Sequence, residues 1–234
     1  MINQYVEIAN YYDNLLTSGY FDYDSLSNTL YNLLAARRKV LDIGVGTGLL
    51  TEKMLALANY KIVGVDFSPR MLEIAKKRFA NSDVKLICED ITEFKTEAKF
   101  EAIVSTGGVI CILEEDGEYR ICSHITDPEK NKQLLAKLHS QLDEDGLLAL
   151  GIQGTHTNYK KEIKDEIFYE QKIKKEGNYI DKWYVFSQAN GEILNEQFCR
   201  FYVFDRRQTT QALIDAGFKQ GYQIIDGKFL VSYK

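Results

Sequence analysis

Proline is scarce in this sequence, and the charge balance shows no basic surplus. The 234 residues include two prolines and sixteen glycines, so the composition indicates no long linker or disordered segment. Lys and Arg number 29 against 34 Asp and Glu, a formal net charge of −5. Neutralising the phosphates of a nucleic acid needs a dense basic surface. The charge therefore argues against a nucleic-acid partner.

Long apolar runs, a secretory leader and metal-binding cysteine patterns are also missing. No apolar stretch approaches the roughly 18 residues that cross a bilayer, and the N-terminus has no basic segment followed by an apolar one. The cysteines, Cys88, Cys111, Cys122 and Cys199, show neither C-x-x-C pairing nor metal spacing. We therefore expect a cytoplasmic protein with free thiols, no membrane partner and no bound metal.

Apolar strands alternate with helical patterns over the first two thirds of the chain. The predicted strands are 39–43, 61–66, 84–90, 100–106 and 146–153. The predicted helices are 49–58, a helix from Pro69 to Phe79 capped by Ser68, and 127–142. Strands that are apolar throughout are buried on both faces, which indicates an α/β fold with a mostly parallel sheet and helices on both faces. In such sheets ligands bind beyond the carboxyl ends of the strands.

The pattern changes after residue 165. Three segments, 165–176, 178–188 and 192–204, alternate polar with apolar or aromatic residues, as antiparallel strands with one solvated face do. A helix ending at Gly217 and a hairpin turning on Asp226-Gly227 follow. Residues 1–36 have a helical pattern with many tyrosines. We expect an N-terminal helical lid (1–36), a core (37–153 and 205–234) and an antiparallel β substrate lid (154–204).

A glycine loop follows the first predicted strand. Residues 42–48 read D-x-G-x-G-x-G, whereas the dinucleotide fingerprint G-x-G-x-x-G would need a third glycine where Leu49 stands. No G-K-[ST] follows, so the loop is not a P-loop. A pyrophosphate sits on a helix N-terminus that favours anions, and a carboxylate such as Asp42 does not help to bind it. The loop suits a ligand with a cationic end, although Asp42 capping the loop is an alternative.

Two further acids end neighbouring strands. Asp66 ends the second strand, at a position where an acid accepts hydrogen bonds from ribose hydroxyls. Asp90 ends the third, with Ile91 beside it, and Glu89 is the alternative acid there. A carboxylate accepts from an adenine amino group, and an isoleucine covers the ring face. Ribose, adenine and a cationic group without phosphate describe S-adenosylmethionine.

Taken in order, these segments resemble those of class I S-adenosylmethionine-dependent methyltransferases. "VLDIGVGTG" is similar to the family's glycine motif, "IVGVDFSPRML" to its ribose segment, "CEDITEF" to its adenine segment and "FEAIVSTGG" to its fourth strand. The ends of the chain resemble the small-molecule N-methyltransferases that act on amino sugars and on glycine. The resemblance implies a Rossmann-like seven-stranded, mostly parallel sheet, with the β lid inserted after the fifth strand.

The resemblance also implies roles for single residues. Gly44 and Gly46 approach the methionine part of the cofactor, Asp42 orients the loop or receives the amino group, and Asp66 holds the ribose. Asp90 and Ile91 hold the adenine, with Phe67 or Met71 packing on its other face. Thr106 and Gly107 lie near the sulfonium, and Tyr12 closes over the cofactor, unless it serves only in packing.

Methyl transfer from a sulfonium is an in-line displacement, in which the enzyme mainly positions the nucleophile and excludes water. An amine acceptor needs only to lose a proton, whereas a hydroxyl needs a base. His124 and His156 lie in loops that border the expected pocket, so they and Tyr12 are the catalytic candidates, with a solvated loop position as the alternative for each histidine. S-adenosylhomocysteine is the expected product.

The acceptor is predicted to be a small molecule, an amine or an aromatic compound, with nitrogen favoured over oxygen. We predict that the acidic run at 114–118 is a solvated loop. The alternative is that it attracts a cationic amine. Aromatic residues in both lids suit an amine or aromatic acceptor or a homodimer contact. Two alternatives stay open: a small-molecule O-methyltransferase, and a non-catalytic module that binds S-adenosylmethionine or a partner. A nicotinamide oxidoreductase is disfavoured by Leu49 and Asp42.

Overall fold

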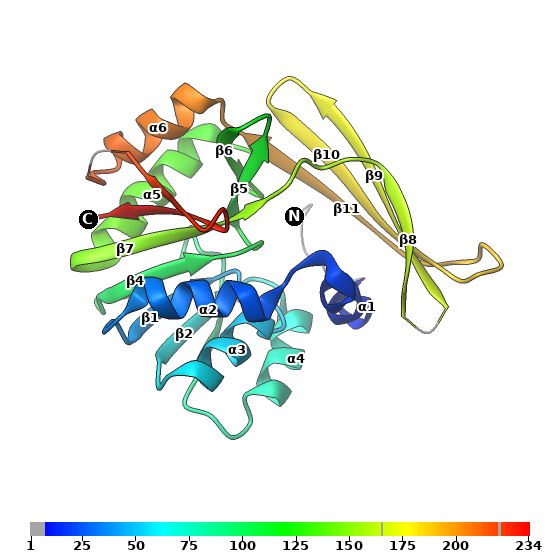
Figure 1. Cartoon of the computed structure of the whole chain (residues 1–234), viewed down its shortest axis with the longest axis horizontal. Coiled ribbons are helices and arrows are strands. Elements are labelled where there is room, and N and C mark those ends of the chain that lie inside the picture. The colour runs from blue at the N-terminus through cyan, green and yellow to red at the C-terminus, as the bar shows by residue number, and fades with distance from the viewer. Residues whose placement is uncertain (1–7, 165, 220) are drawn as a thin grey trace.

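Five parallel strands form the centre of the fold in the computed structural model, which describes residues 8–164, 166–219 and 221–234 (Figure 1). In hydrogen-bonded order they are β3 (Lys85–Cys88), β2 (Lys61–Asp66), β1 (Lys39–Ile43), β4 (Phe100–Ser105) and β7 (Leu142–Gln153). β13 (Phe229–Tyr233) pairs antiparallel with β7, and β12 (Gln223–Ile225) with β13. Strand order reverses between β1 and β4, so ligands are expected at the carboxyl ends of these two strands.

Helices cover both faces of this sheet. They are α2 (Tyr23–Leu34) and α3 (Leu49–Leu57) on one face, and α5 (Pro128–Gln141) and α6 (Arg206–Asp215) on the other. Adjacent residues of β1 point to opposite faces of the sheet. Val40 is buried in one cluster with side chains of α2 and α3, and Leu41 is buried in one cluster with side chains of α5 and α6. The predicted α/β fold, parallel in its core, is confirmed.

Side-chain caps start the helices where the sequence indicates. α4 (Pro69–Arg78) begins after Ser68, whose hydroxyl accepts from the backbone N–H of Met71. Asp127 caps α5 in the same way, by accepting from two backbone N–H groups of the first turn. In both helices proline is the first residue, where its missing N–H costs no hydrogen bond.

An antiparallel arm extends the sheet beyond β7 (Figure 1). Its strands are β5 (Ile110–Glu115), β6 (Glu118–Ser123), β8 (Tyr159–Lys164), β9 (Ile167–Glu176), β10 (Tyr179–Ser187) and β11 (Ile193–Val203). β9, β10 and β11 match the predicted antiparallel segments, and β8 lies outside the predicted strands. The loop predicted for 114–118 is wrong, because β5 and β6 form a hairpin. Asp116 and Gly117 both have positive φ, as its two-residue turn requires.

The first N-terminal helix, α1 (Ala9–Leu15), packs against this arm, whereas α2 packs on the central sheet. α1 leads into one π-helical turn, η1 (Leu16–Tyr20), and then into α2. Leu15 is buried in one cluster with Tyr169 and Phe186 of the arm. Residues 1–7 of the predicted lid lie outside the described residues. None of the helices in the described ranges is long and apolar enough to cross a membrane.

Candidate active site

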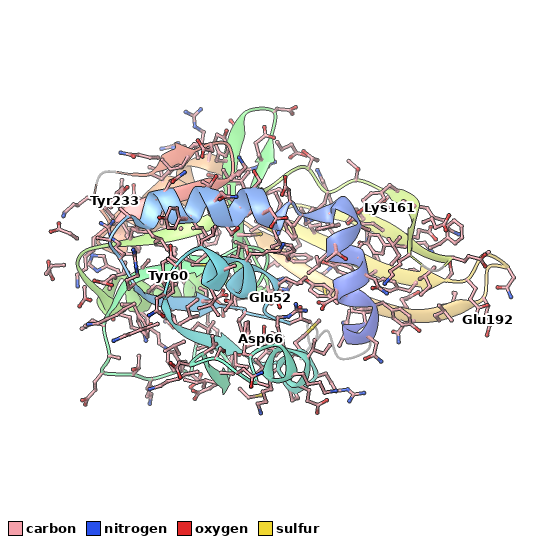
Figure 2. All side chains as sticks on the ribbon, turned by 60° about the horizontal axis from the view of Figure 1, so that its bottom comes forward. Glu52, Tyr60, Asp66, Lys161, Glu192 and Tyr233 are labelled. Carbon is pink, nitrogen blue, oxygen red and sulfur yellow. The ribbon has the colours of Figure 1, made fainter. Side chains whose placement is uncertain are left out.

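A cleft opens at the carboxyl ends of β1, β2 and β4. It encloses about 720 Å³, part of it open to solvent. The predicted residues that line it are Tyr12, Asp42, Gly44, Gly46, Asp66, Phe67, Met71, Thr106, Gly107 and His124. A neighbouring hollow of about 1050 Å³ shares Asp66, Phe67 and His124 with the cleft and adds Asp90 and Ile91. Because the two spaces share these residues, we treat them as one elongated site along the strand ends. Asp66, which lines both, lies away from the arm residues Lys161 and Glu192 (Figure 2).

The glycine loop leaves the cleft room for a ligand. Gly44 has φ of +72°, and a Cβ there would lie 2.6 Å from the Cα of Gly108, so only two bare backbones fit at this crossing. A Cβ on Gly46 would meet nothing nearer than 4.0 Å, which leaves its front open. The N–H groups of Gly44 and Val45 both donate to the carbonyl of Val65, which fixes the loop to β2.

Asp66 joins the glycine loop to the start of α4. Its carboxylate accepts from the N–H of Gly46 at 2.9 Å and from the N–H of Ser68 at 2.8 Å. Burial raises the pKa of Asp66, and the two backbone hydrogen bonds oppose that rise. Each carboxylate oxygen can accept more than one hydrogen bond, so Asp66 keeps capacity for ribose hydroxyls.

Asp42 makes its hydrogen bond away from the loop. Its Oδ2 accepts from the hydroxyl of Thr51 on α3 at 2.6 Å. The side chain is buried, which raises its pKa from 3.8 to about 6; the Thr51 bond lowers it and repulsion from Asp66 raises it further. Among the described residues, the side chain that caps the glycine loop is therefore Asp66, and Asp42 places a carboxylate on the cleft wall.

Asp90 shapes the far end of the site. One of its carboxylate oxygens accepts from the N–H and the hydroxyl of Thr92, each at 2.8 Å, which closes the turn after β3. Its second oxygen remains available to a ligand. Glu89 lines the same hollow, and buried Ile91 forms an apolar part of its wall. Both acids thus stay candidates for the adenine.

The charges of this cleft decide between ligand classes. The described residues that line it include Asp42 and Asp66 but no lysine or arginine. A pyrophosphate in this cleft would meet two carboxylates and no cation, because Lys130 lines the neighbouring hollow and not the cleft. A sulfonium or ammonium gains attraction from both carboxylates. With the open glycine loop, this donor set fits S-adenosylmethionine.

Comparison with known proteins agrees with that fit. Residues 40–146 match the family model described as "Methyltransferase domain". Residues 40–146 thus form a methyltransferase domain. The prediction of a methyltransferase domain is confirmed, and a solved structure that shares its fold, the glycopeptide N-methyltransferase MtfA, was determined with S-adenosylmethionine bound to that protein.

Relatives differ in how much of the chain they share. A malonyl-[acyl-carrier protein] O-methyltransferase of Acetivibrio thermocellus is 35% identical over 85 residues, which are 34% of this chain and 30% of that protein. The chain thus spans about a third of the length of this curated relative. The CcbJ methyltransferase of Streptomyces caelestis has a TM-score of 0.76 at 16% identity, with 99% of this chain and 98% of that one covered. CalS10, an amino pentose methyltransferase of Micromonospora echinaspora, has a TM-score of 0.70 at 16% identity, with 95% of each chain covered. These structural likenesses show the fold.

Beyond the glycine cleft, the methyltransferase domain meets the arm around a second, smaller pocket. This acceptor pocket encloses about 350 Å³ and shares Tyr12, Gly107 and His124 with the cleft. The predicted His156 and four of the aromatic residues expected in the lids also line it, namely Tyr20, Phe21, Tyr184 and Phe201. Its remaining residues were not expected there from the sequence, namely Leu15, Leu16, Cys111 and Gln153. An outer pocket of about 800 Å³ adjoins it and shares Tyr20, Phe21, Gln153 and His156.

Both histidines of the acceptor pocket are held neutral. Burial lowers the pKa of His124 from 6.5 to about 3, and burial likewise lowers the pKa of His156 well below its usual value. The His156 Nε2 lies 3.1 Å from Oε1 of Gln153, and no described residue partners its buried Nδ1. If Nε2 carries the proton, Nδ1 presents an unused lone pair to a donor. His124 directly follows β6 and packs against Phe201, with ring centroids 4.4 Å apart.

Proposed function

We propose that this chain transfers the methyl group of S-adenosylmethionine to an amine nitrogen of a small molecule. The observation that carries the proposal is the enclosed acceptor pocket beside Gly107, with aromatic walls and two neutral histidines. A neutral amine needs a lone-pair acceptor for its N–H and a dry environment, and this pocket offers both. The name of CalS10, which matches 95% of this chain in fold, supports an amine acceptor.

The cofactor, when bound, supplies an electrophilic methyl group on a sulfonium. In our proposal Asp66 holds the ribose hydroxyls, and Asp90 or Glu89 with Ile91 holds the adenine. Phe67 or Met71 covers its other face. Asp42, Gly44 and Gly46 face the methionine part, and Thr106 and Gly107 border the reacting centre.

The acceptor-side residues position and desolvate the amine. His156 accepts a hydrogen bond from the amine N–H at Nδ1, which directs the nitrogen lone pair away from the imidazole. Tyr12 and His124, which line both spaces, form the passage between cofactor and acceptor. In the displacement the carbon–sulfur bond breaks, a carbon–nitrogen bond forms, and the resulting ammonium loses a proton. Positioning of this kind supplies several kcal/mol of the barrier reduction.

Oxygen transfer is the second candidate. It is favoured by the malonyl-[acyl-carrier protein] O-methyltransferases among the curated relatives, although their matches cover about a third of this chain in the first case and 58% in the second. A cytoplasmic location and a homodimer formed through the N-terminal helices and the arm belong to the proposal as well.

Isothermal titration with S-adenosylmethionine, followed by incubation with methyl-labelled cofactor and cell extract, tests the proposal. We expect binding by the wild-type chain, binding at least tenfold weaker by Asp66→Ala, and label transferred to a small amine identified by mass spectrometry. Label on an oxygen favours the second candidate. Binding without any transfer favours a non-catalytic module, and equal binding by wild type and variant overturns the assignment of the site.

A further inference from the structure

Lys182 is a buried lysine that the cofactor site does not use. It lies in the middle of β10 and has no exposed surface. Its ammonium group donates to the hydroxyl of Tyr20 at 2.8 Å and lies 4.3 Å from the ring centre of Tyr184. Within the described ranges, no carboxylate lies within ion-pair distance of Lys182. A buried charge without a counter-ion is costly, so the protein retains this lysine against a free-energy penalty.

Tyr20 connects Lys182 to the acceptor side of the site. Its side chain lines both the acceptor pocket and the outer pocket. The hydroxyl oxygen accepts from Lys182, and no described residue accepts the hydroxyl's own proton. A phenol that accepts from an ammonium becomes a stronger donor, because hydrogen bonds in a chain polarise one another. Tyr20, which lines both pockets, therefore carries a hydroxyl donor that no described residue uses.

The two ends of the site differ in their balance of charge. The cofactor side is mainly acidic, because its lining includes Asp42, Asp66, Glu89, Asp90 and Asp127 but one lysine, Lys130, among the described residues. The described residues that line the acceptor and outer pockets include no aspartate or glutamate, and Lys161 stands in the wall of the outer pocket, on the arm (Figure 2). The acidic run at 114–118 does not change this balance, since Glu115 is paired with Arg120 and Lys175.

We propose that Tyr20, backed by Lys182, binds a carboxylate of the methyl acceptor. The inference rests on the proposed function, and it narrows the acceptor to a small molecule that carries an anionic oxygen group beside its methylated atom. The carboxylate accepts the proton of the Tyr20 hydroxyl, and its charge compensates the ammonium of Lys182. Lys182 is a positioning residue here, because it acts through Tyr20 and does not itself reach the pocket wall.

Binding of an anion also sets the protonation of Lys182. Burial lowers the pKa of this lysine from 10.5 to about 7, so at pH 8 most of it is neutral, and a carboxylate next to Tyr20 favours the charged form. Anion binding at pH 8 should therefore take up a proton. The other titratable groups around Lys182 are Tyr20, Tyr184, Cys111, Cys122, Cys199, His124 and His156.

Isothermal titration of benzoate and of its neutral isostere benzamide into the full chain tests the proposal. The titrations are run at pH 8 with saturating S-adenosylhomocysteine, in two buffers of different ionisation enthalpy. We expect the wild type to bind benzoate at least tenfold more tightly than benzamide, with proton uptake. Lys182→Met should lose that preference at least tenfold together with the proton uptake, and Tyr20→Phe should also lose the preference.

Lys172→Met is the matched control, because Lys172 is exposed on β9 and lies outside both pockets. It should keep the preference for benzoate. An apolar residue in place of a buried unpaired charge is commonly tolerated, and the S-adenosylhomocysteine affinity of each variant verifies its fold. A wild type that does not prefer benzoate, or a Lys182→Met variant that keeps the preference, overturns the inference. If S-adenosylhomocysteine does not bind, that result counts against the proposed function instead. The benzoate and benzamide titrations are then repeated without S-adenosylhomocysteine, and they still test the role of Tyr20 and Lys182.

Discussion

Asp13 of α1 and Arg78 of α4 form an ion pair, with 2.6 Å between Oδ2 and Nη2. The same arginine donates through Nε to the carbonyl of Thr47 in the glycine loop, and the Thr47 hydroxyl donates to the other oxygen of Asp13 at 2.5 Å. Asp13 thus fastens the N-terminal helix to the loop that lines the cofactor cleft, one residue after Tyr12. Charge-assisted hydrogen bonds in a partly buried place are stronger than neutral ones.

Asp13→Asn should weaken binding of S-adenosylmethionine about tenfold, which corresponds to about 1.4 kcal/mol. The amide removes the charge that holds Arg78, so the helix carrying Tyr12 covers the cleft for a smaller fraction of time. Isothermal titration measures the effect. Glu52→Gln is the control, because Glu52 pairs with the other end of the same guanidinium but is about half exposed. An equal loss in both variants would contradict a latching role for Asp13.

Alanine at Gly44 and at Gly46 should separate folding from binding. Gly44→Ala places a Cβ within 2.6 Å of the backbone of Gly108, and neither backbone can give way cheaply. We expect a loss of about 2 kcal/mol or more in the free energy of unfolding, as overpacking in a buried place causes. Gly46→Ala meets only open space and should cost about 1–2 kcal/mol for its positive φ. Gly46 lines the cofactor cleft, so we expect its added methyl group to occupy ligand space. The variant should fold and yet bind S-adenosylmethionine at least tenfold more weakly. Urea unfolding measures the loss of stability, and isothermal titration with S-adenosylmethionine measures the loss of binding.

Asp42 should make the folded chain less stable as pH rises through its pKa. Its folded pKa of about 6 lies above the ordinary 3.8, so between these values the folded state binds more protons than the unfolded state. The free energy of unfolding therefore falls as pH rises from about 4 to about 6, by up to about 3 kcal/mol for this one group. Asp42→Asn does not titrate. Its stability relative to the wild type should grow by about 2–3 kcal/mol between pH 4 and pH 7 in urea unfolding, and a constant difference would show that Asp42 ionises without penalty.

The core of the fold and the cofactor side of the site could be predicted because their signals are local. The pair Ser68-Pro69 predicts the start of a helix. The apolar runs that end near Asp66 and Asp90 predict the ends of two strands. Parallel strands bring those ends to one edge, so short-range patterns are enough to assemble the cleft. Gln153 also ends a strand, and the same rule applied to β7 places it at the acceptor pocket.

Only part of the acceptor side could be predicted. His124, His156 and the aromatic residues of the lids were expected there, whereas the contact of Lys182 with Tyr20 forms between distant segments of the chain. Polar and apolar residues alternate along β10, which predicts two faces of the strand. The alternation does not predict which face is covered by other parts of the chain, and in the structure both Asp181 and Lys182 are buried. Asp181 is satisfied by a bidentate pair with Arg200, whereas Lys182 faces Tyr20 from a helix 162 residues earlier. The β5–β6 hairpin was within reach of the sequence, since Asp116-Gly117 is a favoured two-residue turn.

His124 and His156 should remain neutral well below the pH at which free histidine charges. Burial is the main cause for both, and the ammonium of Lys182 adds repulsion. Because their folded pKa values are lowered, the folded state binds fewer protons than the unfolded state below about pH 6.5, so stability is lost as pH falls through that value. Long-range ¹H–¹⁵N spectra of the folded chain should show two histidines unchanged between pH 8 and pH 5, with the proton of His156 on Nε2. In Lys182→Met the histidine pKa values should rise, since one source of repulsion is gone. Either histidine charging near pH 6.5 in the wild type would contradict its burial, and would make it a candidate base for the acceptor instead of a fixed hydrogen-bond partner.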